Sequence, residues 1–220
     1  MLFIFDMGGV VTNTFHMDTI YKKLHITKDD FFGICNERDR NIWTLLQIGK
    51  ISTEEFWTEF SKRIAYIQRA SLDGVLKYGV NIGFNATSSF NNIPDIKSDL
   101  FRLYFHPSLN KKTINIVNNL KIKNRVVCGT NTIQSHWENH MERGDYSYFQ
   151  QTYASNKIGV MKPNTDFFET IMDAEEVTDP STVFFTDDRI DNVKAAKSIG
   201  INAVHFTSAE DLEKLWNKYY

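Results

Sequence analysis

The chain has 220 residues, of which 42% are hydrophobic and 24% charged, and its formal net charge is −2. This composition suits a globular protein with a full core, and the lack of a basic excess argues against a nucleic-acid binder. No apolar run reaches the length of a membrane span, no signal-peptide pattern opens the chain, and two cysteines make a disulfide framework improbable. We therefore expect a cytoplasmic protein with no membrane or nucleic-acid partner.

The first ten residues hold the most informative stretch. The apolar run 2–5 predicts a short buried strand, which ends at Asp6 and is followed by Gly8 and Gly9. Open α/β sheets bind ligands beyond the carboxyl ends of their strands, so Asp6 is expected at the floor of a crevice. The two glycines allow a tight turn and a close approach of the backbone to a ligand.

Residues 14–70 have apolar side chains at helical spacing and no strand pattern. Gly49 is expected to end one helix there, and Ser52 with Glu55 forms the pattern of a capping box that opens the next. The stretch 79–98 is rich in Asn, Ser and Gly and is typical of a loop. A helical block directly after the first strand indicates a separate helical layer.

From residue 109 onward, strand and helix patterns alternate. Helices are predicted at 109–121, 134–141, 167–172, 191–198 and 209–216, and strands at 125–128, 152–155, 182–185 and 201–206. Such alternation predicts a parallel sheet with helices on both faces. The expected fold class is thus α/β, with a Rossmann-like three-layer core and an inserted helical cap.

Polar side chains follow several of these strands. Thr130 and Asn131 come after the second strand, Asp187 and Asp188 after a later one, and Lys162 lies in a loop. Strand ends of a parallel sheet share one edge, where the carboxylates would repel one another without a cation. Oxygen ligands favour Mg²⁺, and a hydroxyl with an ammonium group suits phosphate oxygens.

This set of motifs resembles the haloacid dehalogenase-like hydrolase superfamily, in the branch with a helical cap after the first strand. The matching segments occur in the family's order and span nearly the whole chain; they are Phe5 to Val10, Thr130-Asn131-Thr132, Lys162-Pro163 and Phe184 to Arg189 followed by Asn192. The closest similarity is to sugar-phosphate phosphatases and to the phosphatase-like domain of epoxide hydrolases.

The resemblance implies a role for each matched residue. Asp6 would be the nucleophile that forms an aspartyl-phosphate, and Thr130 with Lys162 would hold the phosphoryl group. Asn131 and Gly9 would line the substrate site. The Mg²⁺ ion would be bound by Asp6, by the carbonyl of Gly8 and by Asp188, with Asp187 supporting these ligands from behind.

One position departs from the family pattern. Its phosphatases usually carry a second aspartate two residues after the nucleophile, as general acid and base, and this chain has Gly8 there. Three functions stay open: a Mg²⁺-dependent phosphatase of a small phosphorylated metabolite, a 2-haloacid dehalogenase, and a catalytically weak phosphate-binding or regulatory protein.

The domain organisation follows from the same reasoning. Residues 1–13 and 101–220 are expected to form the α/β core, and residues 14–100 the helical cap, including the loop-like stretch. The sequence names neither the substrate nor the cap residues that select it. It also leaves the choice between a monomer and a homodimer open.

Overall fold

The computed structural model describes residues 1–36, 40–72 and 93–220. Its centre is a sheet of five parallel strands in the order β3-β2-β1-β4-β5. The strands are β1 (Leu2–Phe5), β2 (Arg125–Thr130), β3 (Gln151–Ala154), β4 (Val183–Asp187) and β5 (Asn202–His205). β1 lies in the middle, pairing with β2 and β4, so its carboxyl end opens into the centre of one sheet edge.

Helices cover both faces of the sheet. The side chains of β1 alternate: Phe3 and Phe5 pack with one apolar cluster, and Leu2 and Ile4 with the other. The first cluster includes residues of α6 (Lys111–Leu120) and α11 (Ala209–Trp216), and the second includes residues of α9 (Asp166–Ala174) and α10 (Ile190–Ser198). Because both faces of β1 are buried, all four of its residues are apolar. The three-layer α/β core predicted from the sequence is confirmed.

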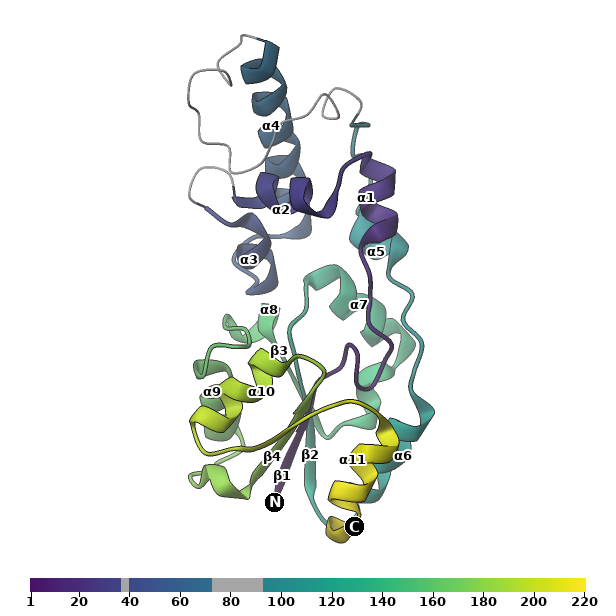
Figure 1. The fold of residues 1–220 in the computed structure, drawn as a ribbon, viewed down its shortest axis with the longest axis vertical. Helices are drawn as coiled ribbons and strands as arrows, with labels where there is room; N and C mark the ends of the chain where they lie inside the picture. Colours follow the sequence, from purple (N-terminus) through teal and green to yellow (C-terminus); the bar gives the residue numbers. More distant parts are fainter. Residues whose placement is uncertain (37–39, 73–92) are drawn as a thin grey trace.

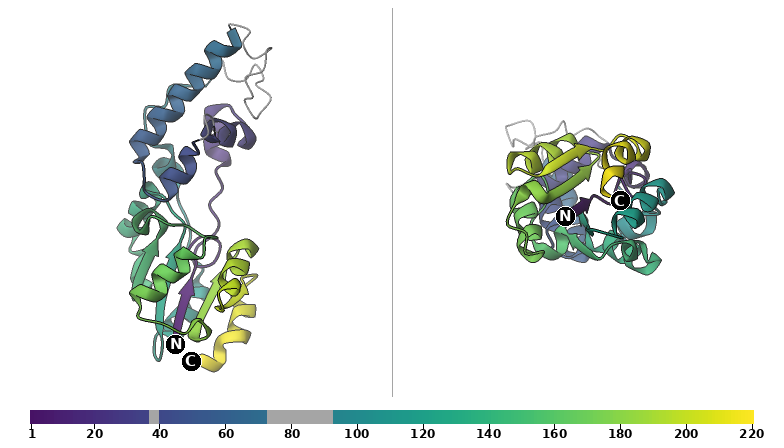
Figure 2. Two further views of the ribbon diagram at one scale, coloured as in Figure 1. Left: turned by 90° about the vertical axis from the view of Figure 1, so that its left-hand side faces the viewer. Right: turned by 90° about the horizontal axis from the view of Figure 1, so that it is seen from below.

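Four N-terminal helices lie beyond the carboxyl ends of the strands, as Figure 1 shows. They are α1 (Asp18–Leu24), α2 (Lys28–Asn36), α3 (Ile42–Gln47) and α4 (Thr53–Leu72). They share an apolar cluster of their own, rich in aromatic rings such as Phe31, Phe56 and Phe60. Both chain termini lie at the opposite end of the molecule (Figures 1 and 2).

Shorter elements complete the chain. The segment that begins at residue 93 leads into α5 (Leu100–Tyr104), and α7 (Gln134–Arg143) follows β2. Between β3 and α9 lies α8 (Ser155–Ile158), and the short 3-10 helices are η4 (Asp145–Tyr148), η5 (Pro180–Thr182) and η6 (Asn217–Tyr219). Among the described residues, none of the helices combines the length and the hydropathy that a membrane span requires.

The structure differs from the sequence prediction mainly at element ends. β2 continues through Gly129 and Thr130, and β4 through Thr186 and Asp187, so these residues belong to the strands. Gly129 fits the strand because a Cβ there would press on Ile4, which fills the space beside it. α5 was not predicted. Of the predicted loop-like stretch 79–98, residues 79–92 lie outside the described residues. Residues 93–98 are described and form no helix or strand.

Candidate active site

The site begins where β1 ends. Asp6 is 8% exposed, and its backbone N–H donates to Thr186 O at 3.0 Å, which fixes it beside β4. The chain then turns back, with Thr12 donating to Met7 O through both its N–H and its hydroxyl. Gly9 has φ +80°, and a Cβ there would collide with the carboxylate of Asp188. Glycine at position 9 therefore lets the turn approach the end of β4.

Lys162 lies at the centre of the polar residues. It is 1% exposed, and its Nζ donates to Asp6 Oδ1 at 2.8 Å, to Asp187 Oδ2 at 2.7 Å and to Gly129 O at 2.8 Å. An ammonium group has three donors, so all three are used. Lys162 thus fixes the orientation of the Asp6 carboxylate and offsets part of the negative charge.

The two aspartates at the end of β4 have different surroundings. Asp187 is fully buried, and its oxygens also accept from the N–H of Arg189 at 2.8 Å and from the Asn192 side chain at 3.0 and 2.9 Å. Asp188 lines the cavity described below. One carboxylate oxygen each from Asp6, Asp187 and Asp188 lies within 4.8 Å of the others. This is an oxygen donor set that could hold a hard divalent cation.

Burial and crowding shift the protonation equilibria here. Burial raises the pKa of Asp6; Lys162 lowers it less than burial raises it, and Asp187 raises it further. Burial likewise raises the pKa of Asp188, with Asp187 adding to the effect. For Lys162, burial lowers the pKa, but the attraction of Asp6 and Asp187 outweighs burial and the pKa is raised. The site therefore holds more negative charge than its surroundings balance.

Thr130 and Asn131 lie on the neighbouring strand end. Thr130 is 4% exposed and lines the same cavity as Asp6. The Asn131 side chain donates to Lys162 O at 2.8 Å and accepts from Lys162 N at 2.9 Å. Its amide thus holds the loop that carries Lys162, although sequence reasoning placed Asn131 among residues that contact substrate.

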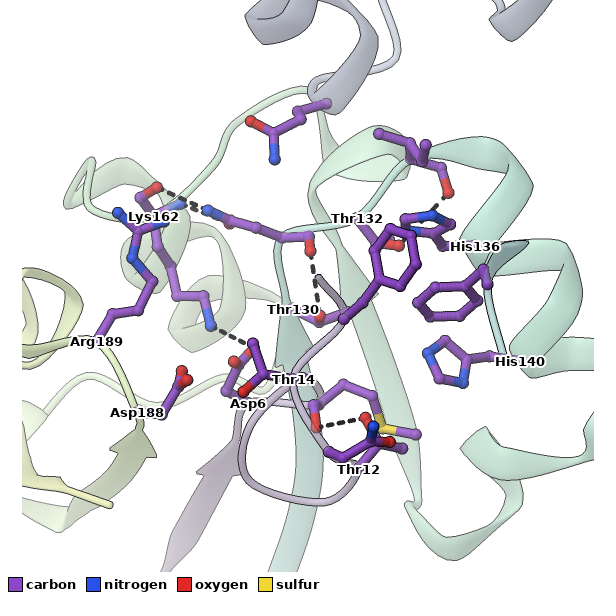
Figure 3. A pocket seen from close by; sticks show the side chains of 18 of the residues that line it. Asp6, Thr12, Thr14, Thr130, Thr132, His136, His140, Lys162, Asp188 and Arg189 are labelled. Atoms are coloured by element: carbon purple, nitrogen blue, oxygen red, sulfur yellow. Dashed lines mark hydrogen bonds and ion pairs between the residues drawn. The ribbon is translucent and has the colours of Figure 1, made fainter. Parts of the chain in front are cut away.

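A cavity of about 260 Å³ opens above Asp6 and brings the candidate residues together. Gly8, Thr130, Asn131, Lys162 and Asp188 line it; Gly9 and Asp187 are not among its lining residues. In Figure 3, Lys162, Asp188 and Arg189 lie on one side, and His136 and His140 on the other, with Asp6 and Thr130 between them.

The histidine side of the cavity is aromatic. His136 stacks on Phe105 with ring centroids 3.8 Å apart, and Phe15 meets both rings edge-on at 4.9 and 5.1 Å. His140 Nδ1 lies 2.8 Å from Asp145 Oδ2, and its ring lies edge-on to Phe105. Burial, together with a smaller effect of His140, lowers the pKa of His136 to about 3; burial also lowers the pKa of His140.

Sequence reasoning missed most of this wall. It anticipated that His136 could line the pocket, but it treated Phe15 as part of the cap core and did not consider Phe105. No local pattern marks Phe105. It reaches the cavity only because the segment after α5 returns beside α7, where His136 lies.

Several solved structures share this fold, and the similarity covers nearly the whole chain. A HAD family enzyme from Bacteroides thetaiotaomicron, solved with magnesium and inorganic phosphate, is 19% identical with a TM-score of 0.64, and the match covers 98% of each chain. A predicted HAD-like family hydrolase from Porphyromonas gingivalis is 20% identical with a TM-score of 0.67, covering 97% of this chain and 96% of that one. A 2-haloacid dehalogenase from Pseudomonas syringae is 12% identical with a TM-score of 0.61, covering 100% and 99%.

Sequence comparison adds a curated relative and a family. The drimenol cyclase drtB of Aspergillus calidoustus is 30% identical over 71 residues, which are 32% of this chain and only 13% of that protein. The model of the haloacid dehalogenase-like hydrolases matches residues 1–200. With the same fold, a carboxylate at the end of the first strand and a family match over most of its length, this chain belongs to the haloacid dehalogenase-like hydrolases.

Proposed function

We propose that the chain is a Mg²⁺-dependent phosphatase that hydrolyses a small phosphorylated metabolite, with Asp6 as the nucleophile. The observation that supports this most is the contact of Lys162 with both Asp6 and Asp187, beside Asp188, at the floor of one cavity. The related structure from Bacteroides thetaiotaomicron, which holds magnesium and inorganic phosphate, supports the same assignment.

The donor set fits the ion. Three carboxylates face the ammonium group of Lys162 and the guanidinium group of Arg189, which leaves net negative charge that a divalent cation would offset. Asp6 uses one oxygen for Lys162, and Asp188 borders the cavity, so both have oxygens for a metal. Asp187 is already hydrogen-bonded through both oxygens and would act from behind, by holding Lys162 and the loop. Gly8 would supply its backbone carbonyl.

The residues would divide the work as follows. When bound, Mg²⁺ supplies positive charge beside the transferring phosphoryl group. Lys162 holds Asp6 in one orientation, so the carboxylate need not reorganise before it attacks phosphorus. The Thr130 hydroxyl lines the same cavity and can donate to a phosphoryl oxygen. Asn131 keeps Lys162 in place through the two hydrogen bonds to its backbone.

The reaction would proceed in two steps. Asp6 attacks phosphorus while the bond to the leaving oxygen breaks, which gives an aspartyl-phosphate. Water then attacks that phosphorus, releases inorganic phosphate and restores the carboxylate. We propose that residues 14–100 are a cap over this site and residues 1–13 and 101–220 the catalytic core, because Trp43 and Gln47 of α3 line the cavity from above.

A screen of phosphorylated metabolites with Mg²⁺, read as phosphate release, tests the proposal. Asp6→Asn should abolish turnover, since the amide is a poor nucleophile. Asp188→Ala should raise the Mg²⁺ concentration for half-maximal activity by about tenfold or more, because a charged ligand is lost. The matched control is Asp191→Ala, a substitution at an exposed carboxylate on the neighbouring helix, which should behave as the parent.

Two outcomes would contradict the assignment. One is full activity of Asp188→Ala at low Mg²⁺. The other is halide release from 2-haloacids by the parent without added metal. A dehalogenase also uses the aspartate as its nucleophile, but its substrate carries no phosphate that a metal cation would have to bind.

A further inference from the structure

The cavity has two chemically distinct ends. Asp6, Lys162 and Asp188 form the polar end, and the opposite wall consists of the rings of Phe15, Phe105 and His136. The indole of Trp43 and the amide of Gln47 border the same space from α3. At about 260 Å³, the cavity has room for a phosphoryl group and a compact organic group.

The ring-lined end carries no positive charge. Among the described residues that line the cavity, the cationic side chains are Lys162 and Arg189, and both lie at the polar end. Burial lowers the pKa of both His136 and His140, so these rings are neutral at neutral pH. A second phosphate or a carboxylate on the substrate would be buried there without a cation to pair with, which is costly. This wall therefore suits an uncharged group.

The polar end favours a leaving group that departs without a proton donor. Position 8 is glycine, and a Cβ there would meet nothing within 4 Å, so no side chain of that residue can protonate the departing oxygen. A phenol has a pKa near 10, as the tyrosine side chain shows, whereas aliphatic alcohols are much weaker acids. A phenoxide can thus leave unaided far more readily than an alkoxide.

We propose that the substrate is a monophosphate ester of a small, uncharged phenol, whose ring packs against Phe105, Phe15 and His136. This assignment rests on the proposed phosphatase function and narrows its substrate class. Asp6 attacks phosphorus, the bond between phosphorus and the aryl oxygen breaks, and the phenoxide leaves with the electron pair and takes a proton from water. Water then attacks the aspartyl-phosphate, which releases phosphate and a proton to solvent. Aromatic ring pairs contribute beyond the area they bury, so the wall selects a ring over an alkyl chain.

Binding calorimetry with Mg²⁺ and phosphonates, which share the phosphoryl group but are not hydrolysed, separates ring recognition from leaving-group chemistry. Phenylphosphonate should bind about tenfold more tightly than methylphosphonate. Phenylphosphonate that carries a carboxylate on the side of the ring opposite phosphorus should lose this roughly tenfold advantage over methylphosphonate. In Phe105→Leu, the ratio of the two dissociation constants should fall by about threefold. Phe184→Leu is the matched control, because Phe184 packs against Phe3 and Trp216 in the core and none of these rings lines the cavity; its ratio should equal the parent's.

Hydrolysis of acetyl phosphate, measured on the same samples with Mg²⁺, tests the proposed function on its own. Acetyl phosphate turnover with equal affinities for the two phosphonates would overturn the aromatic substrate class and leave the phosphatase assignment in place. Tighter binding of the carboxylated ring would also overturn it, because the far end would then have to hold a cation. No Mg²⁺-dependent turnover of any phosphate compound would overturn the phosphatase assignment, and the substrate class with it.

Discussion

At the scale of single residues, Gly8 occupies the position where the family resemblance leads us to expect a second aspartate. Its backbone is outside the left-handed region and the space beside it is open, so a side chain fits there without strain. Gly8→Asp should therefore place a carboxyl group near Asp6. A positioned general acid contributes about 10²- to 10⁴-fold, and most where the leaving group is poor. Steady-state kinetics should show a larger gain for alkyl phosphates than for aryl phosphates.

Gly8→Asn separates proton transfer from shape, because an amide has similar size and cannot donate a proton in the same way. It should give no selective gain on alkyl phosphates. If the parent already hydrolyses an alkyl phosphate quickly and Gly8→Asp slows it, another group must supply the proton, and the argument from Gly8 is wrong.

Several polar residues could be placed from the sequence because each follows a strand pattern, whereas Lys162, in a loop, was assigned through the family resemblance. Asp6, Thr130 and Asp188 needed only the apolar runs before them and the rule that parallel strand ends share an edge. The task of Asn131 could not be inferred, because its amide binds the backbone of Lys162, which is far away in the chain. The roles of all these residues stay predictions.

At the scale of elements, one polar cluster joins the N-terminal helices to the core. Asp99 caps α5 by accepting from Phe101 N at 3.0 Å, and it also accepts from Trp57 Nε1 at 3.2 Å on α4. Ser135 on α7 donates to its other oxygen and lies 3.0 Å from the hydroxyl of Thr53. One carboxylate therefore links three helices.

Removing that carboxylate should destabilise the fold. Asp99→Ala deletes a helix cap and leaves the buried partners of Asp99 without an acceptor, so the free energy of unfolding should fall by about 1–3 kcal/mol. Urea denaturation measures this. Asp95→Ala, an exposed carboxylate four residues earlier, serves as the control and should change little. Equal stabilities for the two variants would show that the cluster does not hold the helices together.

Element prediction worked best where a single local signal decides. Ser52 and Glu55 form the predicted capping box, with Glu55 N donating to Ser52 Oγ at 3.1 Å and Ser52 N donating to Glu55 Oε2 at 2.7 Å. It failed for α5, because this five-residue helix depends on the contacts of Asp99 with α4 and α7 rather than on an apolar repeat. Short helices of this kind are stabilised by packing, which a sequence pattern does not reveal.

At the scale of the whole molecule, the cavity wall lies where two of the three apolar clusters of the described residues approach each other: the cluster of the N-terminal helices and one of the two clusters beside the sheet. Phe15 packs against the cluster of N-terminal helices, while Trp137 of α7 packs against the core cluster next to His136. The side chains that we propose to recognise the substrate therefore also contribute to the stability of the fold. A buried neutral histidine in this wall links both to pH.

This link gives a prediction for acid stability. Burial and, to a smaller extent, His140 together lower the pKa of His136 from 6.5 to about 3 in the folded protein. Between these two pH values the unfolded chain binds a proton that the folded chain does not, so stability falls as the pH falls. Between pH 6.5 and about 3, protonation of His136 in the unfolded chain should lower the free energy of unfolding by up to about 1.4 kcal/mol for each pH unit.

His136→Phe removes the titrating group and keeps a ring that can stack on Phe105. Urea denaturation at a series of pH values should give a shallower acid decline for His136→Phe than for the parent. The variant should be at least as stable at neutral pH, because the buried Nε2 of His136 has no hydrogen-bond partner to lose. His16→Phe, at an exposed position, should follow the parent's curve. Parallel curves for the parent and His136→Phe would mean that His136 takes up a proton as readily folded as unfolded, and that the wall is less closed to water than its contacts indicate.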